Sequence, residues 1–331
     1  MRALRVHRHG EPTAALQLDE VDALEVGPGQ VTVRVGAASL SLPDVLLCRG
    51  RYQLDPPLPF TPGLEVAGRV VAVGDAVDPG LVGRRVVGVP ALPAGGFAHE
   101  AIVPATGVYD VPDDVTDVDA AATHISHRTA HIALHRRAGL HAGQTLLVHA
   151  GAGGTGAAAV QLGVLAGAHV IATAGSAERV AACQALGATR AINYRHEDFV
   201  AIVRDATDGR GADVIFDPVG GETFRESQRC VASEGTIILI GFAGGEIQDM
   251  PANRVLFRNH NIVGLYMGAY SRGDENRRVL ESVHEAIMHL VGSGQLTPLV
   301  SARVDLADVP VALERLRDRQ VIGRVVTCPD P

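Results

Sequence analysis

The chain has 331 residues, with 37 acidic residues against 29 basic ones and a formal net charge of −8 at pH 7, and this length is sufficient for two domains with separate cores. The acidic balance argues against a nucleic-acid-binding face, and because every basic residue is arginine, lysine Schiff-base catalysis is excluded. No apolar run approaches the length of a membrane span, and the N-terminus lacks the apolar core of a signal peptide, so we expect a cytoplasmic protein.

Short apolar runs separated by Gly and Pro make up the first third of the chain. Turn signals such as Pro28-Gly29 and Pro62-Gly63 divide them at the spacing of a β-barrel or sandwich. The runs that predict strands cover residues 31–35, 66–73, 85–89 and 99–103. A helical pattern follows over residues 119–137.

Strand and helix patterns alternate from Thr145 onward. This alternation predicts a doubly wound parallel sheet, and six strands fit two mononucleotide-binding halves. Two of the predicted helices cover residues 177–186 and 224–231, and the tail, residues 298–326, has two strand-like runs around a helix at 309–316. The six predicted strands cover residues 145–149, 169–173, 190–193, 212–217, 235–240 and 261–265.

A G-x-G-x-x-G motif follows the first of these strands and opens a helix. Gly151 permits the tight turn, Gly153 lets the backbone approach a pyrophosphate, and Gly156 allows the helix to pack close to the strand. The pyrophosphate then lies at the helix N-terminus, where unpaired N–H groups and the helix dipole favour an anion. We therefore predict a dinucleotide site that includes Gly154 and Thr155 as well.

The end of the second strand indicates which dinucleotide is bound. An NAD-binding unit carries Asp or Glu there for the ribose 2′-hydroxyl, but the residues after Thr173 include no acid before Glu178. Ser176 and Arg179 instead offer a hydroxyl and a cation to a 2′-phosphate, which favours NADPH. In the alternative interpretation Ser176 caps the next helix and Arg179 is solvated, and both roles are compatible.

Several further motifs, in a specific order, carry a resemblance to a known family. The chain resembles the zinc-free quinone oxidoreductase branch of the medium-chain dehydrogenase/reductase superfamily, over nearly its full length. The resemblance implies a Rossmann NADP(H)-binding domain at residues 123–293 and a mainly β, GroES-like catalytic domain at 1–122 and 294–331. The motifs are Pro59-Phe60-Thr61-Pro62-Gly63 with Glu65 and Gly68, Gly95-Gly96-Phe97-Ala98, Ala185-Leu186-Gly187-Ala188, Asp217-Pro218-Val219-Gly220-Gly221 and Gly323-Arg324-Val325-Val326.

Two positions distinguish the chain from zinc-dependent members of the superfamily. The catalytic zinc ligands of those members, a Cys and a His, correspond to Ser41 and Leu64, and no Cys occurs between Cys48 and Cys183 to form a structural-zinc lobe. We expect no metal. In a competing hypothesis, four histidines at helical spacing bind a metal; these are His124, His127, His131 and His135. No Cys, Asp or Glu shares their face, so we favour exposed or hydrogen-bonded histidine side chains. The first two could instead contact the substrate.

The resemblance also implies roles for individual residues. Thr129 is expected near the nicotinamide ribose or the pyrophosphate, and Tyr194 and Arg324 near cofactor phosphates. In the alternative interpretation Tyr194 packs at a strand end and Arg324 pairs with a surface acid. Backbone groups along the nicotinamide are expected from Gly241, Phe242, Leu265 and Tyr266. On the substrate side the family's usual Asn is replaced by Ser41, an aromatic is missing at Leu46, and Tyr52 is retained.

These expectations combine into a predicted reaction. The cofactor supplies a hydride, and without zinc the acceptor carbonyl must be polarised by hydrogen bonds, for which Ser41 and Tyr52 are the candidates. We predict an NADPH-dependent reductase of quinones or α,β-unsaturated carbonyls. An enoyl-thioester reductase, of the acrylyl-CoA type, and a non-catalytic NADPH-binding sensor are the alternatives. The resemblance further implies a homodimer, formed through residues 261–268.

Overall fold

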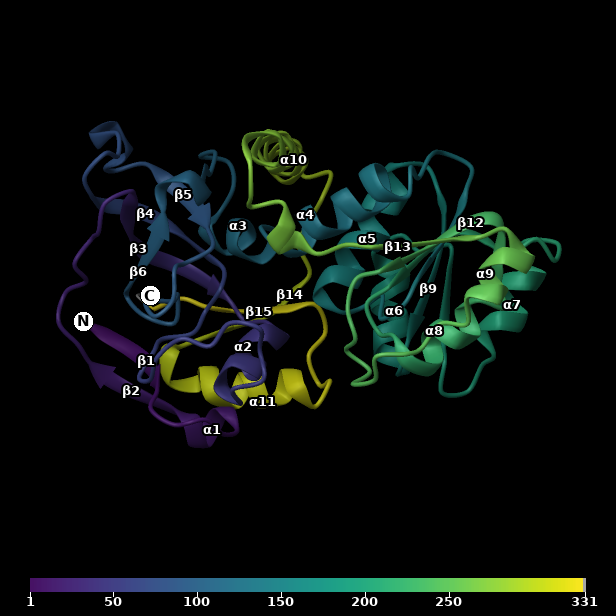
Figure 1. The fold of residues 1–331 in the computed structure, drawn as a ribbon, viewed down its shortest axis with the longest axis horizontal. Helices are drawn as coiled ribbons and strands as arrows, with labels where there is room; N and C mark the ends of the chain where they lie inside the picture. Colours follow the sequence, from purple (N-terminus) through teal and green to yellow (C-terminus); the bar gives the residue numbers. More distant parts are fainter. Residues whose placement is uncertain (330–331) are drawn as a thin grey trace. The chain divides into compact units, whose positions relative to one another are not determined.

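The computed structural model describes residues 1–329, which form two compact units (Figure 1). The first unit contains Met1–Ile125 and the C-terminal segment from His284, and the second is Ser126–Val283. The second unit ends at Val283, whereas the predicted domain extended to residue 293. His284 belongs to the first unit because its Nε2–H donates to the Asp110 carbonyl at 2.8 Å and its ring contacts Tyr109. The second half of α10 (Asp274–Gly292) therefore packs with the first unit.

A seven-stranded, mostly antiparallel sheet organises the first unit. Its order is β14-β15-β3-β4-β5-β7, with β6 pairing on β3, and β1 and β2 form a separate two-stranded ribbon. Figure 1 shows α11 beside α1 and α2 on one side of this unit. The strands are β1 (Arg2–Val6), β2 (Leu16–Glu20), β3 (Gln30–Ser39), β4 (Val66–Val73), β5 (Arg85–Gly88), β6 (Glu100–Pro104), β7 (Val108–Asp110), β14 (Val300–Val304) and β15 (Arg324–Thr327), and the helices α1 (Pro12–Ala15), α2 (Leu42–Cys48), α3 (Asp117–Thr123) and α11 (Val309–Arg317).

The core of the first unit follows from the side-chain pattern of β3. Val31, Val33 and Val35 alternate along the strand and are buried, whereas Arg34 between them is exposed. Phe60 and Phe97 fill the same core, and each fully buried side chain of this size contributes about 1.5–3 kcal/mol. The predicted β domain is thus present.

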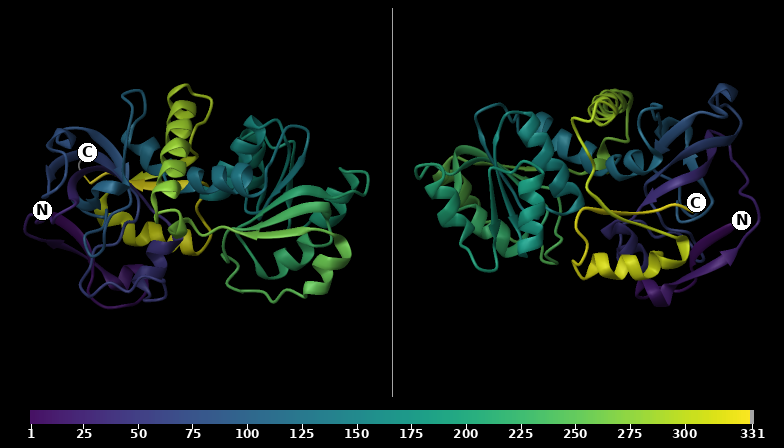
Figure 2. Two further views of the ribbon diagram at one scale, coloured as in Figure 1. Left: turned by 45° about the horizontal axis from the view of Figure 1, so that its top comes forward. Right: turned by 180° about the vertical axis from the view of Figure 1, so that it is seen from behind.

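The second unit is a parallel sheet of six strands with helices on both faces, as Figure 2 shows. The spatial order β10-β9-β8-β11-β12-β13 is 3-2-1-4-5-6 in chain order, which is the Rossmann arrangement. The strands are β8 (Thr145–Val148), β9 (His169–Ala174), β10 (Arg190–Asn193), β11 (Ala212–Asp217), β12 (Val231–Leu239) and β13 (Asn261–Gly264), and the helices α4 (Ser126–His131), α5 (Gly154–Leu165), α6 (Ala177–Ala185), α7 (Phe199–Asp205), α8 (Gly221–Ser227) and α9 (Ala252–Arg258).

The predicted helical region over residues 119–137 is present but is interrupted at residues 124–125. The chain leaves α3 after Thr123, begins α4 at Ser126 and continues as a π-helical turn, Ile132–Arg137. The break has a tertiary cause, because the Ile125 N–H donates to the Glu65 carboxylate at 2.5 Å instead of continuing the helix. A partner 60 positions away in the sequence leaves no local signal.

The predicted helix at 224–231 is also misplaced, since α8 covers Gly221–Ser227 and β12 begins at Val231. Gly220, the N-cap residue, and Gly221 both adopt positive φ, which glycine tolerates, and α8 follows directly on this glycine turn. Val231 pairs with Ala212, and a register shift then brings Thr236 opposite Val214. The strand therefore starts four residues before the predicted residue 235.

Candidate functional site

The glycine loop, residues 150–156, connects the carboxyl end of β8 to α5. Ala150 adopts positive φ, at 52°, and Gly153 is the N-cap of α5 in an extended conformation. No side chain caps this helix N-terminus among the described residues, while Gly153, Gly154 and Thr155 are partly exposed. The first amides of a 12-residue helix are thus presented to an anion from outside.

The three motif glycines are required for different reasons. A Cβ on Gly156 would lie 2.1 Å from the Ala150 carbonyl oxygen, and one on Gly151 would lie 2.8 Å from the Ala172 Cβ, so both positions are closed by the protein itself. At Gly153 the nearest atom would be the Ala150 oxygen at 3.3 Å, which the fold could nearly accommodate. Its missing side chain leaves room for a ligand, as the dinucleotide hypothesis requires.

His149 directly precedes the glycine loop and holds its first residues in place, and it was not identified from the sequence. Ser227 Oγ donates to the Thr223 carbonyl at 2.7 Å, so it must accept from the Nε2–H of His149 at 2.8 Å, and Nδ1 accepts from the Thr173 hydroxyl at 3.0 Å. Burial lowers the pKa of His149 to about 4, with a smaller opposing effect from Asp217. The ring is therefore neutral and ties β8 to β9 and α8.

Ser176, Arg179 and Tyr194 lie together at the ends of β9 and β10. Ser176 is the N-cap of α6 and accepts from the Arg179 N–H at 3.3 Å, so the capping role considered for it is real. A Cβ on Gly175 would lie 2.7 Å from the Tyr194 hydroxyl, which shows that this ring covers the turn before Ser176. Ser176, the backbone of Arg179 and the Tyr194 ring thus meet at the turn after β9.

The other residues predicted near the nicotinamide follow neighbouring strand ends. Gly241 and the half-exposed Phe242 come after β12, and Leu265 and Tyr266 come after β13, where the Leu265 N–H donates to the Leu239 carbonyl at 3.1 Å. Thr129 is buried on α4 of the same unit. All predicted cofactor contacts except Arg324 therefore belong to the second unit.

Asp217 is a further residue of this edge, and the sequence motifs did not assign it a role. Its buried carboxylate ends β11 and accepts from the N–H groups of Val219 and Gly220, at 2.8 and 3.0 Å. These bonds hold the turn into α8, and Gly220 at its centre has a φ of 71°. Asp217 is thus a positioning residue for the turn beside the glycine loop.

In the first unit, Ser41 begins α2 and is bound to Asp44. The Ser41 hydroxyl donates to Asp44 Oδ2 at 2.5 Å, the Ser41 N–H donates to the same oxygen at 2.8 Å, and the Gly63 N–H donates to Oδ1 at 3.0 Å. Burial raises the pKa of Asp44 in spite of these donors. Ser41 can therefore donate a hydrogen bond to a ligand only when Asp44 is protonated.

Tyr52 is half-buried and packs against the core of the same unit.

Arg324 forms an ion pair with Glu65, which is 1% exposed. The Glu65 carboxylate also accepts from Ile125 N–H, so a single buried acid joins β15 to the break after α3. The sequence had left two roles open for Arg324, cofactor phosphate or an acid partner, and the acid partner is present. The partner is internal and is not the surface acid that was considered.

Family models and similar proteins agree with this geometry. A model for the alcohol dehydrogenase GroES-like domain matches residues 27–113, and one for zinc-binding dehydrogenases matches residues 154–285. The chain is 39% identical over 326 residues to the quinone oxidoreductase-like protein 2 homolog of Nematostella vectensis, covering 98% of this chain and 88% of that protein. The chain belongs to the medium-chain dehydrogenase/reductase superfamily.

Solved structures of the superfamily extend the similarity to the whole fold. The quinone oxidoreductase of Pseudomonas syringae pv. tomato has a TM-score of 0.91 at 29% identity, covering 99% of both chains. The Escherichia coli quinone oxidoreductase, in a complex with NADPH, has a TM-score of 0.90 at 26% identity, covering 99% of this chain and 100% of that one. The predicted family and fold class are confirmed, and the chain is an oxidoreductase of the quinone oxidoreductase-like kind.

The four histidines considered as a metal site do not form one cluster. The His124 ring contacts both Tyr109 and His284, at centroid distances of 5.4 and 6.1 Å, and His127 bonds with Ser126 at 3.1 Å. His131 and His135 contact each other in the π-helical turn, with centroids 4.6 Å apart. Within residues 1–329 no group of three His, Cys, Asp or Glu side chains is placed to hold a metal ion.

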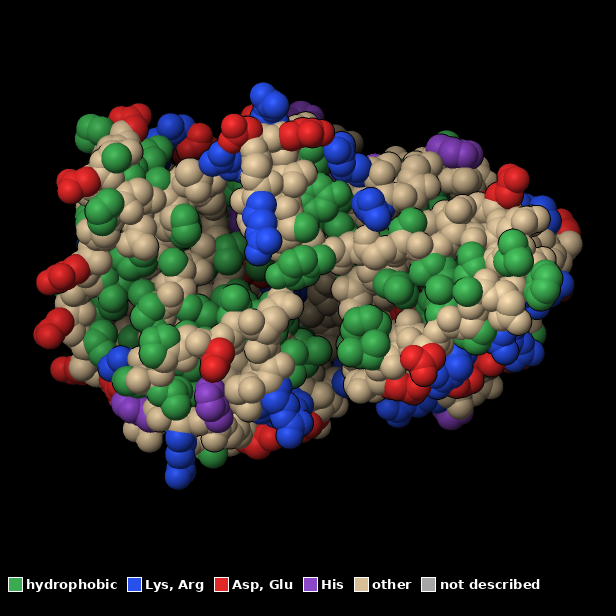
Figure 3. Space-filling view, in the orientation of Figure 1, with side chains coloured by type: hydrophobic (Ala, Val, Ile, Leu, Met, Phe, Trp, Pro, Cys, Tyr) green, Lys and Arg blue, Asp and Glu red, His purple; other side chains and the backbone are tan. Residues whose placement is uncertain are grey.

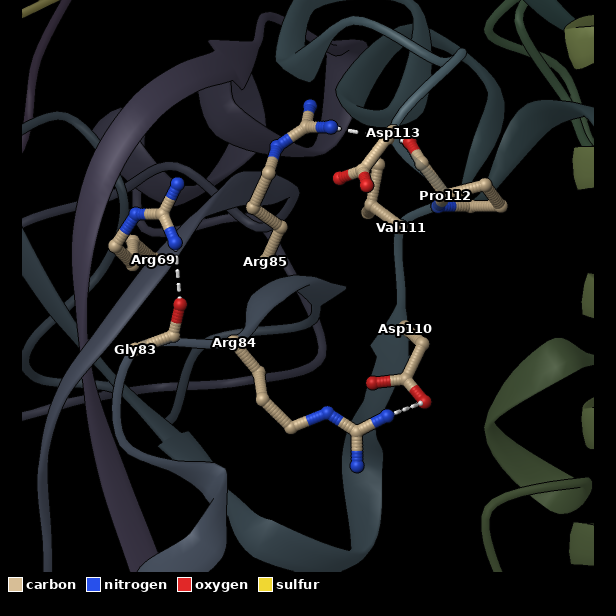
Figure 4. A pocket seen from close by; sticks show the side chains of 8 residues that line it. All are labelled: Arg69, Gly83, Arg84, Arg85, Asp110, Val111, Pro112 and Asp113. Atoms are coloured by element: carbon tan, nitrogen blue, oxygen red, sulfur yellow. Dashed lines mark hydrogen bonds and ion pairs between the residues drawn. The ribbon is translucent and has the colours of Figure 1, made fainter.

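A cavity of about 410 Å³ in the first unit contains none of the candidate residues (Figure 4). Its three arginines are already bound, Arg69 to the Gly83 carbonyl, Arg84 to Asp110 at 2.5 Å and Arg85 to Asp117 at 2.6 Å. We assign this cavity a structural role.

No helix in the described part of the chain is long and apolar enough to cross a membrane.

Proposed function

We propose that this chain is an NADPH-dependent reductase of quinones or α,β-unsaturated carbonyls. The observation that carries the proposal is the uncapped N-terminus of α5 behind a glycine loop whose Gly153 leaves room for a ligand. The N–H groups of Gly154, Thr155 and Gly156 would bind the pyrophosphate. The resemblance to a quinone oxidoreductase that binds NADPH supports the choice of cofactor.

The adenosine end of the cofactor would be held by the residues after β9. Arg179 and the Ser176 hydroxyl suit a 2′-phosphate, and the exposed Tyr194 ring beside Gly175 can pack against the ribose. Thr129, Gly241, Phe242, Leu265 and Tyr266 complete the proposed contacts. Arg324 is a weaker candidate, because a phosphate would have to share its guanidinium with Glu65.

When bound, the nicotinamide supplies the hydride. The protein's part is to orient the acceptor and to donate a hydrogen bond to its carbonyl oxygen, where negative charge develops. Tyr52 is one proposed donor. Ser41 is the other, provided that Asp44 holds a proton and donates it to Ser41 Oγ, which frees the serine hydroxyl. A neutral donor suits activated acceptors such as quinones and enones.

The proposal is tested by titrating the full chain with NADPH and NADH and then measuring NADPH oxidation with a naphthoquinone, a simple enone and a crotonyl thioester. We expect NADPH to bind more tightly than NADH, and turnover with the first two acceptors. Turnover with the thioester alone would identify an enoyl-thioester reductase instead. NADPH binding without turnover of any acceptor would support the non-catalytic NADPH-binding sensor. A chain that does not bind NADPH would overturn the proposal.

We further propose a homodimer. Strand β13 is an outer strand of the six-stranded sheet and carries Ile262 and Val263, which makes its free edge prone to pair with another strand. The preceding helix, α9, has no buried residue and exposes Leu256 and Phe257. A second copy that pairs along β13 would cover both features.

A further inference from the structure

A second cavity lies at the opposite edge of the Rossmann sheet from the glycine loop. It has a volume of about 220 Å³ and is lined by Gln228, Arg229, Arg254 and Arg258. Gln228 and Arg229 come directly before β12, and Arg258 comes shortly before β13. Because the strands are parallel, residues that precede them lie at the amino edge, whereas the glycine loop follows β8 at the carboxyl edge. The cavity is therefore separate from the dinucleotide site.

Gln228 is the buried polar group of this cavity. Its residue is 2% exposed, and neither Oε1 nor Nε2 of its side chain has a hydrogen-bond partner among the described residues. Leaving a buried amide unpaired costs about 1–3 kcal/mol for each group. Its backbone carbonyl, in contrast, accepts from Arg258 Nη1 at 3.1 Å. Gln228 also lines the cavity, but its side-chain N and O atoms are not solvent-accessible, so a ligand would reach this unpaired donor and acceptor once the side chain turns toward the cavity.

The charge of the cavity is positive. Arg229 is paired with Glu226 at 2.6 Å, but Arg258 bonds to a neutral carbonyl, and Arg254 has no partner among the described side chains. Arg254 and Arg258 are four residues apart on α9, so their side chains emerge from the same face. None of the described residues that line the cavity is acidic. Two guanidinium groups are thus available for an oxyanion.

We propose that this cavity binds the phosphate group of a small ligand, either inorganic phosphate or a phosphate monoester. The guanidinium groups of Arg254 and Arg258 and the Gln228 amide N–H would donate to the phosphate oxygens. A P–OH or a hydroxyl of the ligand would donate to Gln228 Oε1, which a simple carboxylate could not do. The volume is below the range of about 300–1,000 Å³ of drug-sized pockets, which favours a small ligand over a dinucleotide.

This site does not depend on the proposed reductase activity. His260, two residues after Arg258, offers an independent probe, because it is 3% exposed and its pKa is lowered by burial and, to a smaller extent, by the charge of Arg258. An anion bound to Arg258 would offset that charge. Its binding should therefore raise the pKa of His260, which proton NMR of the imidazole can follow.

The test measures binding of inorganic phosphate, glycerol 3-phosphate and acetate to the full chain by calorimetry. We expect saturable phosphate binding with a Kd below about 1 mM, and a loss of about tenfold or more in Arg254→Gln and in Arg258→Gln. Arg254 is exposed on α9, so Arg254→Gln should fold normally. Arg190→Gln, which removes the same charge on β10 at the far side of the sheet, is the matched control and should bind like the parent chain.

Tighter binding of glycerol 3-phosphate than of inorganic phosphate would identify a phosphorylated metabolite as the ligand, and the reverse would identify free phosphate. Either result supports the site if Arg254→Gln weakens it while NADPH affinity is unchanged. The proposal is overturned by an absence of saturable binding at about 10 mM phosphate. It is equally overturned if Arg254→Gln binds as the parent does, or if NADPH displaces phosphate competitively, since the anion would then occupy the dinucleotide site.

Discussion

Arg179 is the residue on which the preference for NADPH depends in the proposed site. Replacing it with Gln removes a cation that would bind the 2′-phosphate, and a charge-assisted hydrogen bond of this kind contributes about 1.5–3 kcal/mol. We expect the affinity for NADPH to fall by about tenfold to a hundredfold and that for NADH to change little. Fluorescence titration with both cofactors measures this, with Arg210→Gln at the amino edge of β11 as the control. Equal weakening of both cofactors would contradict the assignment.

His149 makes the stability of the second unit depend on pH. Its folded-state pKa of about 4 lies below its ordinary value of 6.5, so the unfolded chain takes up the proton first as the pH falls. The contribution to the free energy of unfolding is complete above about pH 6.5 and is lost progressively toward pH 4. The two pKa values correspond to a loss of about 3 kcal/mol.

Urea unfolding of the parent chain and of His149→Asn between pH 4 and 7.5 isolates this contribution. Asn keeps a donor and an acceptor but does not titrate, so the variant should be less stable at pH 7 and should approach the parent at low pH. Other titrating groups, such as His131, whose pKa is lowered to about 4 as well, affect both proteins and cancel in the difference. A constant difference at every pH would show that His149 is not the responsible group.

At the scale of the element, two glycines of the glycine loop serve different purposes: Gly156 is needed for folding and Gly153 for ligand binding. In Gly156→Ala the new Cβ would meet the Ala150 carbonyl at 2.1 Å, so we expect a loss of about 1–3 kcal/mol in the free energy of unfolding. In Gly153→Ala the nearest atom is 3.3 Å away, so the fold should be nearly as stable but NADPH should bind about tenfold more weakly or worse. Thermal melts and NADPH titrations of both variants test this. Strong NADPH binding by Gly153→Ala would show that the pyrophosphate lies elsewhere.

The same elements show what the sequence could reveal. The strand, glycine loop and helix were predictable because all their signals lie within about 30 consecutive residues. The Ser41–Asp44 capping box was visible as well, since Ser at the N-cap with an acid three residues later has a recognised pattern, although we had considered Ser41 only as a substrate contact. The break after α3 and the His149 contacts were not predictable, because Glu65 and Ser227 come from distant parts of the chain.

At the scale of the whole molecule, an outer sheet edge and a helix with two exposed apolar side chains come next to each other in the chain. The outer edge of β13 is unpaired within the described residues, and the preceding α9 exposes Leu256 and Phe257, which are 71% and 79% accessible. Figure 3 shows apolar side chains over the position of α9. Exposure of two large apolar side chains in neighbouring positions, next to an open strand, is typical of an interface.

Phe257→Glu tests whether a second copy covers this surface. Because Phe257 makes no buried contact in the single chain, the substitution should leave the melting temperature of the monomer nearly unchanged, whereas a charge buried without a partner in a dimer would oppose association. We expect sedimentation to give a dimer for the parent chain and a monomer for Phe257→Glu. Leu165→Glu, on an exposed position of α5, is the control and should remain dimeric. A parent chain that sediments as a monomer would refute the homodimer, and a dimeric Phe257→Glu would exclude α9 from its interface.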